Sequence, residues 1–264
     1  DAATGRMIVS PITLGRDWLG FAGSERQLPP LVVAAGTFEP EPSQDQVNVM
    51  VNSFRNAWTP RLEKGSPNRS FGISTGGNTS VLGVRTGYIG SLSYSYGQEI
   101  RDDEVRAYAE PTDGTTEIDR FEGSTGRASV LWGGLFNASL MFGANTRLSF
   151  NNTYNRSADS EARRETGFNN NLGTRLIIDR LRFVERSVRS NQIAANRQFG
   201  ARGRLNLAFT SSSVSRNEPD RSEFVRADAG DGQAPYWLEY PQAAVRTYGR
   251  LTESNYNTSA DYSL

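Results

Sequence analysis

The side chains that most often carry catalysis are missing from this sequence. Among its 264 residues there is no cysteine and no histidine. Thiolate nucleophiles, disulfides, zinc sites and Ser-His-Asp chemistry are therefore excluded within this chain. Carboxylates remain, and pairs of them serve glycosidases or bind hard cations. Because no paired-carboxylate or serine motif is localised, we predict that the protein has no catalytic residues, is not an enzyme and uses no cofactor.

One stretch, residues 99–120, is rich in the oxygen ligands that calcium prefers. Its acidic residues include Asp102, Asp103, Glu104, Glu110, Asp113, Glu117 and Asp119. The stretch lacks the ligand spacing of a dedicated calcium loop. We therefore interpret it as a solvated loop and predict no metal site.

Composition and net charge limit the kinds of partner and the kinds of fold that we expect for this chain. The formal net charge is +0, so nothing predicts nucleic acid as a partner. Hydrophobic residues make up 36%, which is low for a dry core, whereas 10% aromatic residues argue against disorder. No window approaches the roughly 18 apolar residues of a membrane helix. A membrane-spanning form of this chain must therefore be a β-barrel.

Alternation of apolar and polar residues is the strongest pattern in the chain. In the clearest stretch one face carries Tyr88, Gly90, Leu92, Tyr94 and Tyr96, and the other carries Ile89, Ser91, Ser93 and Ser95. Successive side chains of a strand point to opposite faces, so the stretch predicts a ribbon with one apolar and one polar side. The pattern recurs over segments longer than the roughly 5–6 residues of an ordinary strand. It favours a sheet with lipid on one face and water on the other.

The elements that carry this pattern are predicted as follows. Residues 1–46 form an irregular N-terminal segment, 47–58 a strand or, alternatively, a short helix, and 61–68 a turn. Strands are predicted at 70–76, 84–98, 127–140, 146–155, 168–178, 184–198 and 203–215, with a strand pair over 243–264. Loops are predicted at 99–120, 156–167, 217–220 and 228–235. Short turns, such as Gly143–Asn145, alternate with longer loops. We therefore predict an all-β fold, an antiparallel transmembrane β-barrel or part of one, with 47–264 as its strands and loops.

Aromatic residues near the predicted strand ends indicate membrane-interface girdles. They are Tyr88, Tyr94, Tyr96, Trp132, Phe150, Tyr154 and Phe209. Such amphipathic rings belong where hydrocarbon meets the headgroups. The alternative is that they pack a soluble core. The opposite faces, rich in Arg, Asn, Ser, Thr and Gln, suit a water-filled or plug-filled lumen, or else an ordinary solvated surface.

Several short stretches, taken in order, resemble the barrel domain of TonB-dependent outer-membrane receptors. They are Arg16–Phe21 followed by Arg26–Pro29, then Phe54–Trp58, Tyr88–Gly97, Phe183–Ile193 and Arg216–Arg221. Within them, the Glu-Arg pair at 185–186 followed by Ser190, and the Glu-Pro-Asp-Arg run at 218–221, match a recurrent arrangement of that family. The resemblance covers most of the chain, from about residue 16 to about residue 226.

The resemblance implies localisation in the outer membrane of a Gram-negative-type bacterium. It also implies uptake of a scarce substrate, which is a siderophore, a glycan, a peptide or a vitamin. The partners would be outer-membrane lipid, a plug domain and, through the plug, the TonB complex. A complete receptor has a plug and about 22 strands, whereas this length accommodates roughly eight to eleven strands. We therefore expect residues 1–264 to be part of one barrel, with the plug outside this chain. The alternative is a small complete barrel.

Candidate substrate-binding residues lie in and near the predicted loops. The rings of Tyr236, Trp237 and Tyr240 would stack on a substrate at a barrel mouth, and Arg221 and Arg226 would hold an anionic group. The alternative for each is loop packing. Two rival functions also remain: a plug-less structural or adhesive outer-membrane barrel, and a soluble β-rich ligand-binding module.

Overall fold

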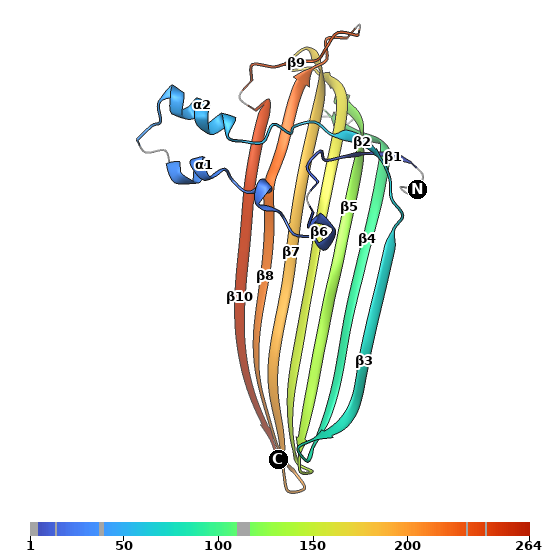
Figure 1. Cartoon of the computed structure of the whole chain (residues 1–264), viewed down its shortest axis with the longest axis vertical. Coiled ribbons are helices and arrows are strands. Elements are labelled where there is room, and N and C mark those ends of the chain that lie inside the picture. Colours follow the sequence, from blue (N-terminus) through green and yellow to red (C-terminus); the bar gives the residue numbers. More distant parts are fainter. Residues whose placement is uncertain (1–4, 14, 37–39, 110–116, 231, 241) are drawn as a thin grey trace.

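The body of the molecule is one antiparallel sheet of long strands (Figure 1). The computed structural model describes residues 5–13, 15–36, 40–109, 117–230, 232–240 and 242–264. The strands lie in the order β10-β8-β7-β6-β5-β4-β3, and β9 pairs with β8. Their bounds are β3 Arg69–Val81, β4 Val84–Ala109, β5 Glu117–Phe142, β6 Thr146–Asn169, β7 Thr174–Phe199, β8 Gly203–Ala227, β9 Tyr236–Trp237 and β10 Ala244–Ser263. Within the described residues the sheet is open, because β3 and β10 each have a strand partner on one side only. The predicted all-β class and antiparallel long strands are confirmed.

The region before the sheet folds across one of its faces (Figure 1). Here β1 (Arg6–Val9) pairs with β2 (Arg61–Lys64), so the turn predicted at 61–68 is wrong for its first half. Two short 3-10 helices, η1 (Asp17–Leu19) and η2 (Ser24–Arg26), precede α1 (Pro30–Ala35) and α2 (Gln44–Asn52). No described helix has the length and apolar character to cross a membrane.

Helix α2 occupies the segment for which a strand was the first prediction and a short helix the alternative. The alternating valines there fit either element. A capping box decides the outcome: the Ser43 hydroxyl accepts from the Gln46 backbone N–H, and the Gln46 side chain accepts from the Ser43 N–H. Such a box satisfies two of the free N–H groups at a helix start. The strand prediction at 47–58 is therefore wrong.

Charged segments predicted as loops are continuous strand instead. Residues 99–109 belong to β4, 156–167 to β6 and 217–220 to β8. Their charges pair across the sheet, as when Arg182 on β7 meets Glu218 on β8 at 2.9 Å. Opposite charges on adjacent strands stabilise pairing, so a charged run need not end a strand. Residues 110–116 of the predicted acidic loop lie outside the described residues.

Two further predictions about strand limits need correction. The strand predicted at 168–178 contains the tight turn between β6 and β7, at 170–173, and the pair predicted over 243–264 is the single strand β10. The predicted hairpin turn at 143–145 is confirmed, and 82–83 and 200–202 are similar short turns at the same end of the sheet. At the other end, β8 and β10 are joined by the longer connection 228–243. Three short turns therefore lie at the end of the sheet where the C-terminus lies, and the tight turn at 170–173 lies at the opposite end (Figure 1).

The two faces of the sheet differ in chemistry toward the short-turn end. One cross-strand row on the first face, which we call the aromatic face, is Tyr88, Ala138, Phe150, Ile193 and Phe209. The neighbouring row on the other face, which we call the polar face, is Asn137, Asn151, Gln192 and Thr210. Amide hydrogen bonds link this polar row, with Asn151 donating to Gln192 and Gln192 donating to Thr210. The predicted ribbon with one apolar and one polar side is thus present in the sheet.

Candidate functional site

The best-defined contact in the molecule joins the sheet to residues 16–26, which we call the strap. Tyr94, Trp132 and Arg156 are direct cross-strand partners on β4, β5 and β6, so they form one row across the aromatic face. The Tyr94 hydroxyl donates to the Trp18 carbonyl and the Trp132 indole N–H to the Leu19 carbonyl, each at 2.8 Å. Arg156 Nε donates to the Gly20 carbonyl at 2.8 Å. Three consecutive strap carbonyls are therefore bound by three consecutive strands.

Glu185 on β7 completes this contact with an acceptor. Its Oε2 accepts the Ala22 backbone N–H at 2.8 Å, and the same carboxylate is ion-paired with Arg156. The Arg156 guanidinium also lies over the Phe21 ring, 3.8 Å from its centroid. Such a stack adds cation–π attraction to the main-chain hydrogen bonds.

Gly20 is required at its position in the strap by backbone geometry and by space. Its φ is +71°, in the left-handed region that residues with a Cβ adopt at a cost. A Cβ at this position would lie 3.1 Å from the Ala158 Cβ. The strap therefore approaches the sheet as closely as a glycine allows.

The far end of the strap is held by a buried ion pair. The Arg26 side chain is 3% exposed and donates to both carboxylate oxygens of Asp17, at 2.6 and 2.8 Å. It also donates to the Ile12 carbonyl and lies over the Phe183 ring at 4.1 Å. A buried cation of this kind needs its charge and its donors satisfied locally. Arg26 therefore closes the strap into a loop against the sheet.

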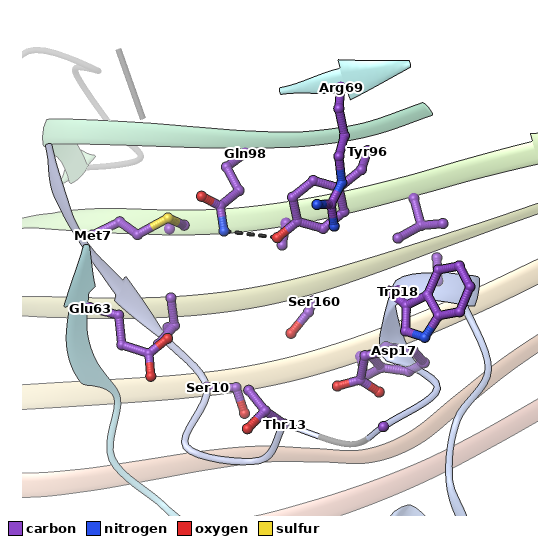
Figure 2. A pocket seen from close by; sticks show the side chains of 17 residues that line it. Met7, Ser10, Thr13, Asp17, Trp18, Glu63, Arg69, Tyr96, Gln98 and Ser160 are labelled. Carbon is purple, nitrogen blue, oxygen red and sulfur yellow. Dashed lines mark hydrogen bonds between the residues drawn. The ribbon is translucent and has the colours of Figure 1, made fainter. Parts of the chain in front are cut away.

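A cavity of about 290 Å³ lies between this N-terminal region and the sheet (Figure 2). Its apolar lining includes Met7, Trp18 and Phe183, and its polar lining includes Ser10, Gln98 and Ser160. Gln98 donates to the Tyr96 hydroxyl at 2.8 Å, as the dashed line in Figure 2 marks. An apolar cavity with a few fixed polar groups is the usual form of a small-ligand site.

The charged side chains around the cavity differ in whether they already have an ion-pair partner. Asp17 is paired with Arg26, and Glu63 is paired with Arg61 at 2.6 Å. The Arg69 guanidinium lies 5.0 Å from the Tyr96 ring centroid and has no carboxylate within ion-pair distance among the described residues. A small ligand with an anionic group would therefore find its counter-charge at Arg69.

Farther from the short turns, both faces carry ion pairs. On the polar face, Asp159 contacts Arg127 at 2.8 Å and Arg186 at 2.9 Å, and it accepts from the Ser129 hydroxyl at 2.8 Å. Partial burial alone would raise the pKa of Asp159. The hydrogen bonds from Arg186, Ser129 and Arg127 outweigh burial and lower the pKa below its ordinary value.

This lowered pKa makes Asp159 a source of acid sensitivity. A carboxyl whose folded-state pKa is depressed contributes stability above its unfolded pKa of about 3.9, and the contribution is lost as pH falls through the folded value. We expect Asp159→Asn to reduce stability at pH 7 and to flatten the loss of stability on acidification below about pH 4. Glu161→Gln serves as the control, because it removes a carboxyl from the same strand that forms no ion pair within the described residues. Equal profiles for both variants, measured by denaturant unfolding, would contradict this role.

Tyr248 on β10 lies in another ionic group. Its hydroxyl donates to Asp220 at 3.2 Å, and Asp220 is ion-paired with Arg246. Burial and the negative charge of Asp220 raise the pKa of Tyr248 to about 12. The phenol therefore stays protonated across the physiological range and serves as a hydrogen-bond donor.

The predicted substrate-binding residues do not line the cavity. Tyr236, Trp237 and Tyr240 lie together around β9 and are all exposed, as aromatic ligand contacts would be. Arg226 is ion-paired with Asp179 at 2.6 Å, so its guanidinium is already neutralised. Arg221 is half-buried opposite Thr247. The structure therefore brings Arg226 beside the aromatic cluster, as the cross-strand partner of Trp237, whereas Arg221 lies apart from it.

The predicted membrane-interface aromatics fall into two groups. Tyr88, Phe150 and Phe209 lie exposed in one row of the aromatic face. The others lie farther along, at or beside the strap and the cavity. Trp132 packs against Tyr154 with 5.2 Å between ring centroids, while Tyr94 binds the strap and Tyr96 lines the cavity. For Tyr94 and Trp132 the polar partner is the strap backbone, where the sequence had predicted lipid headgroups.

Sequence analysis did not predict the strap site, although its residues lay in stretches that were singled out. Arg16–Phe21 and Phe183–Ile193 supply strap residues and Glu185, respectively, and the structure brings the two stretches together. The occurrence of both stretches in the sequence was the signal that could have pointed to the strap site. Within the described residues, no group of three or more potential ligands could hold a metal ion.

Comparison of the chain with protein-family models, with curated proteins and with solved structures found no match.

Proposed function

We propose that this chain forms part of the wall and outer loops of an outer-membrane transport barrel that takes up a scarce substrate with energy from the TonB complex. The observation that carries the proposal is the exposed aromatic face backed by an amide-lined polar face at the short-turn end. A transmembrane barrel alternates apolar, lipid-facing residues with polar, lumen-facing residues along every strand. The row through Phe150 and the row through Asn151 have the chemistry of these two surroundings, and the amides of Asn152 and Asn191 on the aromatic face are hydrogen-bonded to each other.

The length of the uncharged part of the strands agrees with a membrane crossing. Residues 134–142 of β5 carry no charge, and in the facing residues 146–154 of β6 the only charge is Arg147, on the polar face. A tilted transmembrane strand needs about 9–11 residues. We therefore assign the membrane-spanning part to these residues and to their cross-strand partners, which on β7 begin at Arg189 and end at Arg197.

The rest of each strand would project beyond the membrane. A strand of 26 residues, such as β4, extends roughly 85 Å, well beyond the roughly 30 Å of hydrocarbon. The ion pairs gather in this projecting part, where charges such as Asp159 and Asp179 would meet water rather than lipid. The strap and the cavity also lie there, on the side of the longer connections.

Substrate uptake rests on the resemblance to TonB-dependent receptors together with two features of the projecting end. The exposed rings of Tyr236, Trp237 and Tyr240 offer stacking surfaces, and the cavity beside Arg69 offers an enclosed site for an anionic group. A siderophore, a glycan, a peptide and a vitamin all remain candidate substrates. The plug and the TonB complex would act from outside this chain.

Two other functions make different predictions. A structural or adhesive barrel would have the same strands but neither a plug nor energy-dependent uptake. A soluble β-rich binding module would bury its aromatic face against protein and remain in the aqueous fraction. The exposure of Phe136, Ile193 and Leu207 on this face favours a lipid-facing sheet over the soluble module.

The test is to express the parent gene, separate the membranes and compare boiled and unboiled samples on gels. We expect an outer-membrane band that shifts on boiling, together with substrate uptake that stops when TonB is deleted. A heat-modifiable band with TonB-independent growth on every substrate would favour the structural barrel. A protein in the soluble fraction whose band does not shift on boiling would exclude both the transport barrel and the structural barrel.

A further inference from the structure

We propose that the row Tyr94, Trp132 and Arg156, with Glu185, is a peptide-binding site that the strap occupies in cis and that a peptide of the same chemistry can occupy in trans. The proposal does not depend on the transport function. It rests on how the sheet binds the strap, which is through main-chain groups more than through side chains.

The geometry is that of a site that recognises the main chain of a short 3-10 turn ending in a left-handed residue. Donors on β4, β5 and β6 bind the carbonyls of residues 18, 19 and 20, and an acceptor on β7 binds the N–H of residue 22. Donors and acceptor are held in place by the strands themselves, because the first three are cross-strand partners. A rigid, preorganised row of this kind lowers the entropic cost of binding a flexible segment.

The site also sets two requirements on the ligand. The third residue of the bound segment must be glycine, because Gly20 has a φ of +71° and its missing Cβ would meet Ala158. The next residue should be aromatic, since the Phe21 ring lies under the Arg156 guanidinium at 3.8 Å. The preferred ligand is therefore a peptide with a Gly-aromatic step and free main-chain carbonyls before it.

The part of the strap around Trp18 has the features of a replaceable ligand, although Arg26 at the far end is buried. The strap contacts the sheet as a short loop of two 3-10 turns, and Trp18 remains 52% exposed although its carbonyl is bound. Displacing the strap would take the bound carbonyls away from the Tyr94 hydroxyl and the Trp132 indole N–H, whereas Arg156 and Glu185 would keep their ion pair with each other. A peptide that restores the same bonds would compensate for that loss.

The experiment uses the detergent-solubilised protein and a fluorescent peptide with the sequence of residues 16–26. Gly20→Val in the protein should release the strap and leave the row intact. We expect the peptide to bind this variant at least about tenfold more tightly than wild type, in which the strap competes at high effective concentration. A peptide carrying the same Gly20→Val change is the matched control and should not bind.

Variants of the row test the recognition itself. In the Gly20→Val background, Trp132→Phe and Tyr94→Phe each remove one donor and should weaken peptide binding by about 3- to 10-fold. A change on the opposite face, such as Asn155→Ser, should leave the affinity unchanged. Equal affinity for all of these variants would show that the peptide binds elsewhere and would overturn the proposal.

A cysteine pair keeps the proposal testable if the Gly20→Val protein does not fold. The chain has no cysteine of its own, and a Gly20 Cβ would lie 3.1 Å from the Ala158 Cβ, near the about 3.8 Å separation of a disulfide. Gly20→Cys with Ala158→Cys should lock the strap when oxidised, exclude the peptide, and admit it after reduction. If the peptide binds neither the reduced pair nor a folded Gly20→Val variant, the row serves the strap alone and the proposal fails.

Discussion

Phe150→Arg is expected to destabilise the folded protein in lipid by about 2–4 kcal/mol, the cost of an arginine on the lipid face near the bilayer midplane. Phe150 lies on the aromatic face between Ala138 and Ile193 and is 39% exposed in the isolated sheet. In the proposed barrel that exposed surface is covered by hydrocarbon. The free energy of unfolding in lipid vesicles, followed by denaturant titration, measures the effect.

The next residue along the strand provides the matched control. Asn151 points to the polar face and bonds to Gln192. Asn151→Arg therefore places the same charge on the opposite side of the sheet, only one residue (about 3.3 Å) farther along the strand, in an aqueous lumen. We expect it to cost less than about 1 kcal/mol, as for charges outside the apolar band. Equal costs for the two variants would mean that the two faces meet the same surroundings.

Asp179→Ala is expected to destabilise the protein by about 3–5 kcal/mol, because it leaves two guanidinium groups without their shared counter-charge. The Asp179 side chain is fully buried and contacts Arg164 and Arg226, each at 2.6 Å. Removing one partner of a buried ionic group costs far more than the group contributes as a whole. Thermal or denaturant unfolding at neutral pH measures this loss.

Asp228→Ala is the control for this prediction. Asp228 pairs with Arg175 at 3.5 Å, and both side chains are substantially exposed. An exposed pair of this kind is worth roughly 0–1 kcal/mol, so the variant should be close to wild type. A similar stability for the two variants would show that the Arg164–Asp179–Arg226 group is solvated and contributes little.

The fold class was predictable because alternation alone specifies a two-faced strand. The stretch from Tyr88 to Tyr96 shows the pattern most clearly, and the structure places it in β4. Strand ends were less predictable. Charged runs such as 156–167 lack a visible partner in the sequence, and only the register of β6 against β7 brings Asp159 near Arg186.

The strap site was beyond prediction for a related reason. Its ligands come from four strands, and its targets are backbone carbonyls that any sequence possesses. A sequence pattern shows which side chains are present. A site that binds main-chain groups is therefore hard to recognise in a sequence, and here Gly20 is the residue that indicates it. Helix α2 shows the opposite case, because the capping pair Ser43 and Gln46 is visible in the sequence, whereas the strand prediction rested on the alternating valines.

The most direct test of the membrane-spanning sheet is a nitroxide scan of residues 146–160, with one introduced cysteine per variant in a chain that has none. In lipid vesicles, collision with oxygen should peak at positions 148, 150 and 152, whereas collision with a water-soluble nickel complex should peak at 149, 151 and 153. The alternation should fade beyond 156, where the strand leaves the membrane and the strap covers it. Uniform access of the nickel complex to both sets of positions would contradict a lipid-facing wall.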